Sequence, residues 1–308
     1  MDKKAEISII IVSWNTRDLL RICLVSTLTA VEKFGSASEI IVVDNASSDG
    51  TAEMVAREFS GVRLIANTAN LGFAAATNQG IRASHGRYIL FLNPDTKATE
   101  SFLRILVQFL ESNPRAGAAG PLLLGRSGEV QTSCFRLPTL GRELWRLLHL
   151  DGFNERSSTR QLDLRRPKQA ETICGACILV RREVLDQIGL LDERFFIYSE
   201  EVDFCRRMFD FGWEIYWVPQ AVVVHYGGES TKQVGTQMFL ELYRSKIQYF
   251  RKHLGFWGVA AYKLVLLAAT LARLLLPPLL CVCRPARREE FRVLIRNYRA
   301  LLLRLTAL

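Results

Sequence analysis

Residues 6–44, EISIIIVSWNTRDLLRICLVSTLTAVEKFGSASEIIVVD, decide the predicted fold. Residues 6–14 form a continuous apolar run rich in β-branched side chains, which is typical of a strand covered on both faces. Residues 16–34 read as a helix with Thr16 as a possible N-cap, and residues 39–44 read as a second strand. A strand, a helix and a second strand in this order predict a βαβ unit with parallel strands.

The same alternation continues to residue 112. Further strands are predicted at residues 62–67 and 87–93, and further helices at residues 48–59, 72–84 and 100–112. This order predicts an α/β protein with a mostly parallel central sheet. In such sheets, ligands bind beyond the carboxyl ends of the strands. The segments at those ends read SWNT, DNASSDG, NTANLGFA and NPDT, and their Asn, Asp, Ser and Gly residues predict a polar ligand.

The second half of the chain is less regular. Residues 125–170 contain little periodicity and many Arg, Gly and Pro residues, which predicts a long loop region of the kind that acts as a lid. Beyond it, the sequence predicts a strand and a helix at 171–189, a helix at 199–212, strands at 213–219 and 221–228, and a helix at 236–254. We therefore place the end of the α/β domain near residue 235.

The chain is basic, and its charge is concentrated near the C-terminus. The formal net charge of the 308 residues is +9. Residues 244–308 hold thirteen Lys or Arg and two Glu, a net charge of +11, so residues 1–243 are left at −2. Long aliphatic runs between the basic residues favour an anionic membrane surface over a nucleic acid as the partner of this tail. The seven cysteines are irregularly spaced, which predicts reduced thiols inside a cell.

The tail contains two apolar runs, residues 264–272 and 274–283, which are separated by Arg273 and interrupted by Pro277–Pro278. Neither run reaches the roughly 20 residues that span a bilayer, so a re-entrant or surface-lying segment is predicted rather than a transmembrane helix. The last stretch has an apolar helical face flanked by arginines, formed by Phe291, Leu294, Ile295, Tyr298, Leu301, Leu302 and Leu305 with Arg288, Arg292, Arg296 and Arg299. Such a helix binds a membrane surface; the alternative is a helix that packs on the domain, or on a partner, and keeps a solvated basic side.

The polar strand ends carry residues suited to a nucleotide and a metal ion. Asp95 can hold a hard divalent cation, since Mg²⁺ prefers one or two carboxylates together with phosphate oxygens and water. Asp44 can accept hydrogen bonds from a base or a ribose, and Asn15, Asn70 and Asn78 offer both donors and acceptors. A nucleotide diphosphate bridged by a metal would use all of these groups. The chain has no G-x-x-x-x-G-K-[ST] motif and no G-x-G-x-x-G after its first strand, which disfavours a P-loop and a dinucleotide-binding fold.

Seven motifs follow one another between residues 6 and 230: IVSWN, VVDNASSDGT, NLGFAAATNQG, LFLNPDT, GACILVRREV, IYSEEVDFCRR and VVHYGGES. In this order the chain resembles the family 2 glycosyltransferases, in particular the rhamnosyltransferase-like bacterial enzymes that act on cell-surface polysaccharides. The resemblance implies a GT-A fold, a nucleotide-sugar donor, a Mg²⁺ or Mn²⁺ ion and inversion at the anomeric carbon.

The resemblance also implies a set of donor-binding residues. Asp44 would contact the pyrimidine base of the donor, and Asn15 would lie in the same pocket. The full set is Ser13, Trp14, Asn15, Asp44, Asn70, Gly72, Asn78 and Asn93.

The implied metal ligands are Asp95 and His225. Asp95 matches the second acid of the family's D-x-D metal motif, whereas Asn93 replaces the first acid and leaves fewer charges on the metal. His225 matches a histidine that supplies a further metal ligand in some relatives. The alternative is a histidine whose hydrogen bonds are satisfied within its strand.

Inverting transfer is a single displacement, so it needs a base to deprotonate the acceptor hydroxyl. Glu200, Glu201 and Asp203 lie within one helical turn, so at least two of them can face the cleft. The family pattern is Glu-Asp with the second acid as the base, and that position is Glu201 here. Glu200 is the alternative base, and Asp203 is alternatively an acid of a solvated first turn.

These features predict a GT-A catalytic domain at residues 1–235, with a nucleotide-sugar half at about 1–98 and an acceptor half at about 99–235. Residues 236–308 form a helical, membrane-associating tail. The predicted protein is peripheral or monotopic at the cytoplasmic face of the cell membrane, with self-association through the tail as an alternative.

The predicted function is metal-dependent inverting transfer of a sugar to a saccharide on a polyprenyl carrier. The donor is a dTDP- or UDP-sugar, with dTDP-rhamnose as the first guess. The alternative is a non-catalytic scaffold that binds nucleotide sugars at a membrane. The acidic cluster at residues 200–203 disfavours this alternative, because a pure binder has little use for a base.

Overall fold

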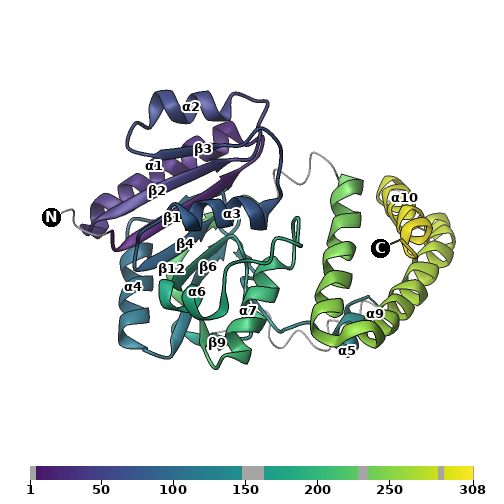
Figure 1. The fold of residues 1–308 in the computed structure, drawn as a ribbon. Helices are drawn as coiled ribbons and strands as arrows, with labels where there is room; N and C mark the ends of the chain where they lie inside the picture. The colour runs from purple at the N-terminus through teal and green to yellow at the C-terminus, as the bar shows by residue number, and fades with distance from the viewer. Residues whose placement is uncertain (1–4, 148–162, 228–234, 284–287, 308) are drawn as a thin grey trace. The chain divides into compact units, whose positions relative to one another are not determined.

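The computed structural model describes residues 5–147, 163–227, 235–283 and 288–307. The chain forms two compact units (Figure 1). The sheet unit comprises residues 1–137, 157–196 and 200–233, and the helical unit comprises residues 138–156, 197–199 and 234–308. Residues 138–156 and 197–199, which the sequence analysis places in the catalytic domain, therefore belong to the helical unit.

The predicted alternation of strands and helices up to residue 112 is confirmed. The strands of the sheet unit are β1 (Ile7–Ser13), β2 (Ser38–Asp44), β3 (Arg63–Ala66), β4 (Tyr88–Leu92), β5 (Thr96–Ala98), β6 (Ala116–Leu124), β7 (Val130–Gln131), β8 (Cys134–Phe135), β9 (Lys168–Ala170), β10 (Thr172–Ile173), β11 (Cys177–Arg181) and β12 (Glu214–His225). Its helices are α1 (Arg17–Phe34), α2 (Thr51–Glu58), α3 (Phe73–Arg82), α4 (Phe102–Ser112), α6 (Arg182–Ile188) and α7 (Glu200–Asp210).

The main sheet has the strand order β3-β2-β1-β4-β11-β6-β12-β5. Strands β1 to β4 are parallel, and their register places Ser13 opposite Asp44 and Ile11 opposite Leu92. Strand β11 runs antiparallel between β4 and β6, so the sheet is mixed. The carboxyl ends of β1, β2 and β4 and the start of β11 therefore lie at one edge of the sheet.

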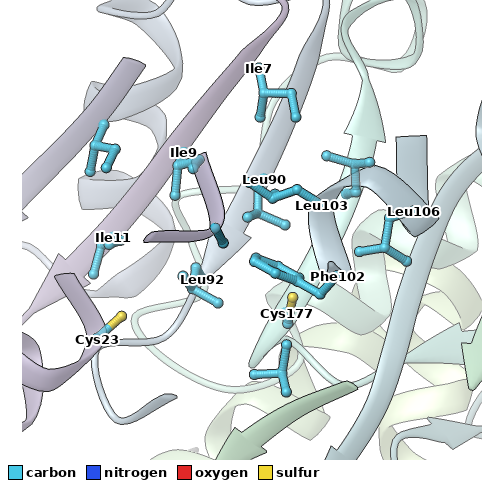
Figure 2. Close-up of a cluster of buried hydrophobic side chains, with 14 of the residues drawn as sticks. Ile7, Ile9, Ile11, Cys23, Leu90, Leu92, Phe102, Leu103, Leu106 and Cys177 are labelled. Atoms are coloured by element: carbon cyan, nitrogen blue, oxygen red, sulfur yellow. The ribbon is translucent and has the colours of Figure 1, made fainter. Parts of the chain in front are cut away.

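The apolar run of β1 is explained by burial on both faces of the sheet. Ile7, Ile9 and Ile11 belong to one buried cluster that includes residues of β4 and α4, and Figure 2 shows this cluster around Phe102. Ile10 points to the other face and belongs to a second cluster with residues of α3 and β11. A strand in this position cannot alternate apolar and polar side chains.

Strand β6 was not predicted, although it pairs with both β11 and β12. Its sequence, AGAAGPLLL, is dominated by residues that are depleted in strands. The small side chains allow a close approach, because a Cβ added at Gly120 would lie only 2.2 Å from Cγ2 of Ile173. Packing rather than intrinsic propensity determines this strand.

Two further predictions about the sheet unit are wrong. The two strands expected at 213–219 and 221–228 are one strand, β12, with a register shift between Val218 and Val222 around Pro219, which has no backbone N–H to donate. The region 125–170 is not one long loop, because β7, β8, α5 and β9 lie in its described part. Residues 148–162 of that region lie outside the described residues.

The helical unit contains α5 (Leu140–Leu147), α9 (Gly235–Cys283) and α10 (Arg288–Arg304). Gly255 interrupts α9 with a non-helical backbone, φ 66° and ψ −161°. Within the described residues, Gly235–Leu274 is long and apolar enough to cross a membrane. Helix α9 continues through Arg273, which separates the two apolar runs in the sequence and whose guanidinium lies 5.2 Å from the ring centroid of Tyr298.

Candidate active site

The loops that follow β1 and β2 are tied together at the sheet edge. The backbone N–H of Asn15 donates to Oγ of Ser47 at 2.9 Å, and Oδ1 of Asn15 accepts the backbone N–H of Ser48 at 2.8 Å. Asn15 and Ala46 have φ angles of 51° and 63°, a conformation that costs non-glycine residues about 1–3 kcal/mol. The two loops therefore hold a defined and strained shape beside Asp44.

Asp44 presents one carboxylate oxygen without a hydrogen-bond partner among the described residues. Its side chain is buried, and its Oδ2 accepts the backbone N–H of Ser47 at 3.1 Å. Its Oδ1 is buried and has no partner. Because a buried acceptor without a donor is unfavourable, this oxygen is suited to an N–H or O–H group of a ligand.

The other predicted residues of this loop differ in whether their side chains are exposed or are used in hydrogen bonds within the loop. Ser13 is buried, and its hydroxyl lies 2.9 Å from that of Thr16, so its side chain is used within the loop. Trp14 is partly exposed. The first helical N–H of α1, that of Arg17, is satisfied by Oδ2 of Asp49 at 2.9 Å.

Asn45, which the sequence analysis did not select, organises the adjoining loop. Its Nδ2 donates to Oδ1 of Asn70 at 2.8 Å and to the carbonyl of Gly72 at 3.2 Å. Its Oδ1 accepts the backbone N–H of Leu71 at 3.0 Å. The feature of the sequence that could have indicated Asn45 is its position directly after Asp44. The predicted residue Asn70 is thus held in place by its neighbours.

Gly72 is required by the close approach of the segment around Phe196. Its φ is 87°, and an added Cβ would lie 2.5 Å from the carbonyl oxygen of Phe196. The same carbonyl accepts the backbone N–H of Phe73 at 2.6 Å. No other residue type fits here without displacing that segment.

Asp95 and His225 face each other at the end of β4. Nε2 of His225 lies 3.4 Å from Oδ1 of Asp95, and the two side chains are only 13% and 7% exposed. The turn is fixed by the N–H of Asn93, which donates to the carbonyl of Ala176 at 2.9 Å, and by the N–H of Tyr226, which donates to the carbonyl of Asp95 at 2.9 Å. Asn93 is partly exposed.

Gln131 of β7 determines which nitrogen of His225 carries the proton. Its Nε2 donates to the backbone carbonyl of His225 at 2.8 Å, which orients its Oε1 toward Nδ1 of the same histidine at 3.0 Å. Since an amide oxygen only accepts, Nδ1 carries the hydrogen. In the neutral imidazole, Nε2 therefore presents a lone pair, and this atom is buried without a hydrogen-bond partner among the residues that the structure describes.

The acidic start of α7 lies near the same edge. Glu200 is buried, and its Oε2 has no hydrogen-bond partner in the described part of the chain. Burial, with the neighbouring charge of Glu201, raises the pKa of Glu200 well above its ordinary value. Tyr198 and Ser199, directly before it, have φ angles of 70° and 65°, so the backbone that leads into this turn is strained.

The thiol of Cys174 lies close to both the acidic turn and Asp95. Burial, together with the carboxylates of Glu201 and Asp95, raises the pKa of this thiol to about 11. Next to it, a Cβ added at Gly175 would lie 3.5 Å from Cγ of Glu201. Glu201 and Asp95 are therefore both close enough to act on one thiol at the start of β11.

Residues 8–189 match the family described as Glycosyl transferase family 2. The chain belongs to this family. The chain of this glycosyltransferase is 30% identical over 236 residues to N-acetylglucosaminyl-diphospho-decaprenol L-rhamnosyltransferase of Mycobacterium tuberculosis, covering 71% of this chain and 76% of the relative. It is 23% identical over 198 residues to dTDP-rhamnosyl transferase RfbF of Shigella flexneri, covering 63% and 62%. The predicted resemblance to the rhamnosyltransferase-like branch is confirmed.

A solved structure shares the fold of the glycosyltransferase. Mannosyltransferase PcManGT from Pyrobaculum calidifontis, in complex with GDP-Man and Mn²⁺, aligns with a TM-score of 0.58 and 17% identity over 98% of this chain and 88% of that one. The GT-A fold with its mixed, mostly parallel sheet is confirmed.

The Asp95–His225 pair of the glycosyltransferase fits a divalent cation. Two oriented acceptor atoms 3.4 Å apart, one of them a lone pair without a donor, suit a positive ion between them. No group of three or more His, Cys, Asp or Glu suited to a metal occurs among the residues described here. Further ligands would have to be diphosphate oxygens and water, which Mg²⁺ prefers.

Two predicted site residues of the glycosyltransferase have other partners. Nδ2 of Asn78 donates to the carbonyl of Leu191 at 2.8 Å and to Oε1 of Glu193 at 2.9 Å, and its Oδ1 accepts the N–H of Leu191 at 3.1 Å. These contacts use both amide hydrogens. Asn78 therefore anchors α3 to the segment after α6, and we do not retain it as a donor-binding residue.

Asp203 is likewise structural. It is fully buried, and its Oδ2 accepts Nε of Arg207 at 2.9 Å. Arg207 in turn donates to the carbonyls of Ile188 and Leu190 at 2.7 and 2.8 Å, at the end of α6. The alternative of a solvated first turn is wrong, because Asp203 forms a buried ion pair, and we propose a structural rather than a catalytic role for it.

Proposed function

We propose that this glycosyltransferase moves rhamnose from dTDP-rhamnose to a lipid-linked saccharide during cell-surface polysaccharide synthesis. The observation that carries the proposal is the pair formed by Asp95 and Nε2 of His225, two facing acceptors at a sheet edge beside the acidic turn of α7. The names of the relatives from Mycobacterium and Shigella support rhamnose as the sugar and, for the first, a polyprenyl diphosphate acceptor.

The nucleotide is held at the ends of β1 and β2. The unpartnered Oδ1 of Asp44 accepts the ring N–H that uracil and thymine both present, so Asp44 selects a pyrimidine without separating dTDP from UDP. Asn15 supports the same pocket from the first loop. Gly72 and Asn70 define the wall contributed by the segment before α3.

Asp95 and His225 hold the Mg²⁺ or Mn²⁺ ion, and Gln131 keeps Nε2 of His225 unprotonated for this purpose. When bound, the cation neutralises charge on the leaving diphosphate. Asn93 replaces an acid near this position, so the protein supplies one carboxylate here. We therefore expect cation binding to be tight only with the diphosphate present.

The acidic turn supplies the base. Two adjacent carboxyl groups in a buried site do not both ionise readily, and the raised pKa of Glu200 keeps its proton in place. We therefore assign the role of base to Glu201, which takes the proton from the acceptor hydroxyl. The hydroxyl oxygen attacks the anomeric carbon opposite the diphosphate, the bond from that carbon to the diphosphate oxygen breaks, and the configuration inverts.

The helical unit keeps the enzyme at the cytoplasmic face of the cell membrane, where a lipid-linked acceptor resides. The net charge of +11 in residues 244–308 supports attraction to anionic lipids. The long apolar stretch Gly235–Leu274 supports contact with the bilayer.

The test is sugar transfer by the purified full-length protein, with dTDP-rhamnose and UDP-sugars offered separately to an N-acetylglucosaminyl-diphospho-polyprenol acceptor. We expect transfer from dTDP-rhamnose that requires Mg²⁺ or Mn²⁺ and is lost in Asp95→Ala. Asp210→Ala, which removes only an exposed ion pair with Arg206, should retain it. Donor binding without transfer to any acceptor would favour the scaffold alternative, and undiminished transfer by Asp95→Ala would overturn the assignment.

A further inference from the structure

The helical unit exposes an unusual number of large apolar side chains on one part of α9. The exposed fractions are 49% for Leu254, 76% for Phe256, 79% for Trp257, 67% for Leu264 and 43% for Leu271. We call these five residues the apolar strip. A surface of this kind on a soluble protein marks a place of contact with another surface.

The strip follows helical spacing. Trp257, Leu264 and Leu271 are seven residues apart and so share one face of α9 over about 21 Å. The opposite face is buried inside the helical unit, where Tyr262 and Leu266 are fully covered. This segment of α9 is therefore apolar on two sides, and only the inner side is covered by the described part of the chain.

The break at Gly255 places two aromatic rings at the start of the strip. Phe256 and Trp257 pack edge to face with their ring centroids 5.3 Å apart, and both are exposed. Arg251 and Lys252 lie four and three residues before the break at Gly255. Exposed aromatic rings beside basic side chains are typical of a segment that sits at the level of lipid headgroups.

Helix α10 packs along the part of α9 that follows Gly255. It runs antiparallel to the second part of α9, because Tyr298 lies beside Arg273 while Nζ of Lys263 donates to the carbonyl of Thr306 at 3.5 Å (Figure 1). The outer face of α10 carries three exposed arginines, Arg292, Arg296 and Arg299. If α9 crossed the bilayer, α10 would carry these charges into the hydrocarbon, which is unfavourable.

We infer that the second part of α9 lies in the plane of an anionic bilayer, with the apolar strip inserted at the boundary between headgroups and acyl chains. The charge of +11 in residues 244–308 selects anionic lipid, and the strip supplies the insertion. This deepens the proposed function, on which it rests for the presence of a membrane-borne acceptor.

The test compares co-sedimentation of full-length variants with vesicles of phosphatidylglycerol and phosphatidylcholine and with vesicles of phosphatidylcholine alone. The strip variant is Phe256→Glu with Trp257→Glu. The matched control is Phe209→Glu with Phe211→Glu, since these phenylalanines of the sheet unit are 57% and 61% exposed. We expect the strip variant to lose about tenfold or more in affinity for anionic vesicles, and the control to bind like the unmodified protein. Equal binding by both variants would overturn the inference.

A second measurement guards against a variant that fails to fold. Brominated lipids quench tryptophan that enters the acyl boundary, so they should quench the unmodified protein more than Trp257→Phe, a substitution that keeps an aromatic ring. Identical quenching of the two would contradict insertion. A dimer that dissociates on the strip substitutions, with vesicle binding unchanged, would instead assign the strip to a second copy of the chain.

The outcomes separate this inference from the proposed function. Strip variants should keep the metal-dependent stabilisation by dTDP in a thermal-shift assay, because they leave the sheet unit intact. Strip-dependent vesicle binding by a protein that transfers no sugar would preserve the membrane surface and reject the reaction. Transfer to a lipid-linked acceptor by a protein that binds no vesicles would support the proposed reaction and reject the membrane surface.

Discussion

Nε2 of His225 lies 3.4 Å from Oδ1 of Asp95, and Gln131 keeps the proton of the imidazole on the opposite nitrogen. In the neutral imidazole, the lone pair of Nε2 therefore faces a carboxylate oxygen. We propose that a divalent cation joins these two atoms and offsets the cost of burying a carboxylate just beyond the end of β4.

Gln131 is expected to act as a positioning residue for the cation. Gln131→Ala should weaken Mn²⁺ binding in the presence of dTDP by about 10- to 100-fold, because the imidazole loses the acceptor that fixes its tautomer. Nitrogen-15 NMR of the histidine rings should show Nδ1–H for His225 in the unmodified protein and a tautomer mixture in the variant. Gln131→Glu, which still accepts from Nδ1, should restore the tautomer.

The control for this prediction is Gln169→Ala, on the exposed strand β9. An unchanged tautomer and unchanged Mn²⁺ affinity in Gln131→Ala would show that the contact with His225 is only structural.

Asp44 is expected to select the pyrimidine. Asp44→Ala removes the acceptor for the base N–H, a hydrogen bond to a charged group worth about 1.5–3 kcal/mol. Calorimetric titration should therefore show about 10- to 100-fold weaker binding of dTDP and UDP, with little change for inorganic diphosphate. Equal loss for all three ligands would mean that Asp44 only supports the loop at Ser47.

The raised pKa of Glu200 predicts how stability depends on pH. The folded state keeps this proton to a higher pH than the unfolded state, so the unfolded state binds fewer protons between the two pKa values and stability falls as pH rises through that window. Glu200→Gln cannot ionise, so it should melt at a higher temperature than the unmodified protein near pH 7 to 8. The gain should be about 2–4 °C for each kcal/mol recovered and should vanish below the ordinary pKa of glutamate.

Thermal melting from pH 4 to pH 8 tests this directly, with Glu183→Gln, in the first turn of α6, as the control. A lower melting temperature for Glu200→Gln across the whole range would show that the buried carboxylate is ionised and stabilising.

Asp203 is expected to support the fold rather than the reaction. Asp203→Ala leaves Arg207 without its buried partner, and breaking one side of such a pair costs about 3–5 kcal/mol. The melting temperature should fall strongly, while kcat measured well below it changes little. A folded variant with normal melting and a loss of kcat of about a thousandfold would return Asp203 to the catalytic group.

Much of the fold was predictable because burial leaves a local pattern. The run Ile9, Ile10 and Ile11 indicates a strand covered on both faces, and the structure covers it from both. Strand β6 leaves no such pattern, because Ala and Gly are chosen there for close packing against Ile173 rather than for strand propensity.

The positions of Asp44 and Asp95 at the sheet edge were predictable, because each position follows from the end of one strand. It was not predictable where a partner comes from far along the chain. The side-chain amide of Asn78 donates a hydrogen bond to Leu191, which lies 113 residues further along the chain. His225 is oriented by Gln131, which lies 94 residues before it in the sequence. Pairings of this kind arise only when the sheet brings distant strands together.

The central claim is that Asp95 and His225 bind a divalent cation together with the donor diphosphate. It is tested most directly by electron paramagnetic resonance titration of Mn²⁺ into the full-length protein with saturating dTDP, for the unmodified protein, Asp95→Ala and His225→Ala. The account predicts binding that depends on dTDP and falls by about tenfold or more in each variant. Equal Mn²⁺ binding by all three proteins, with or without the nucleotide, would contradict it.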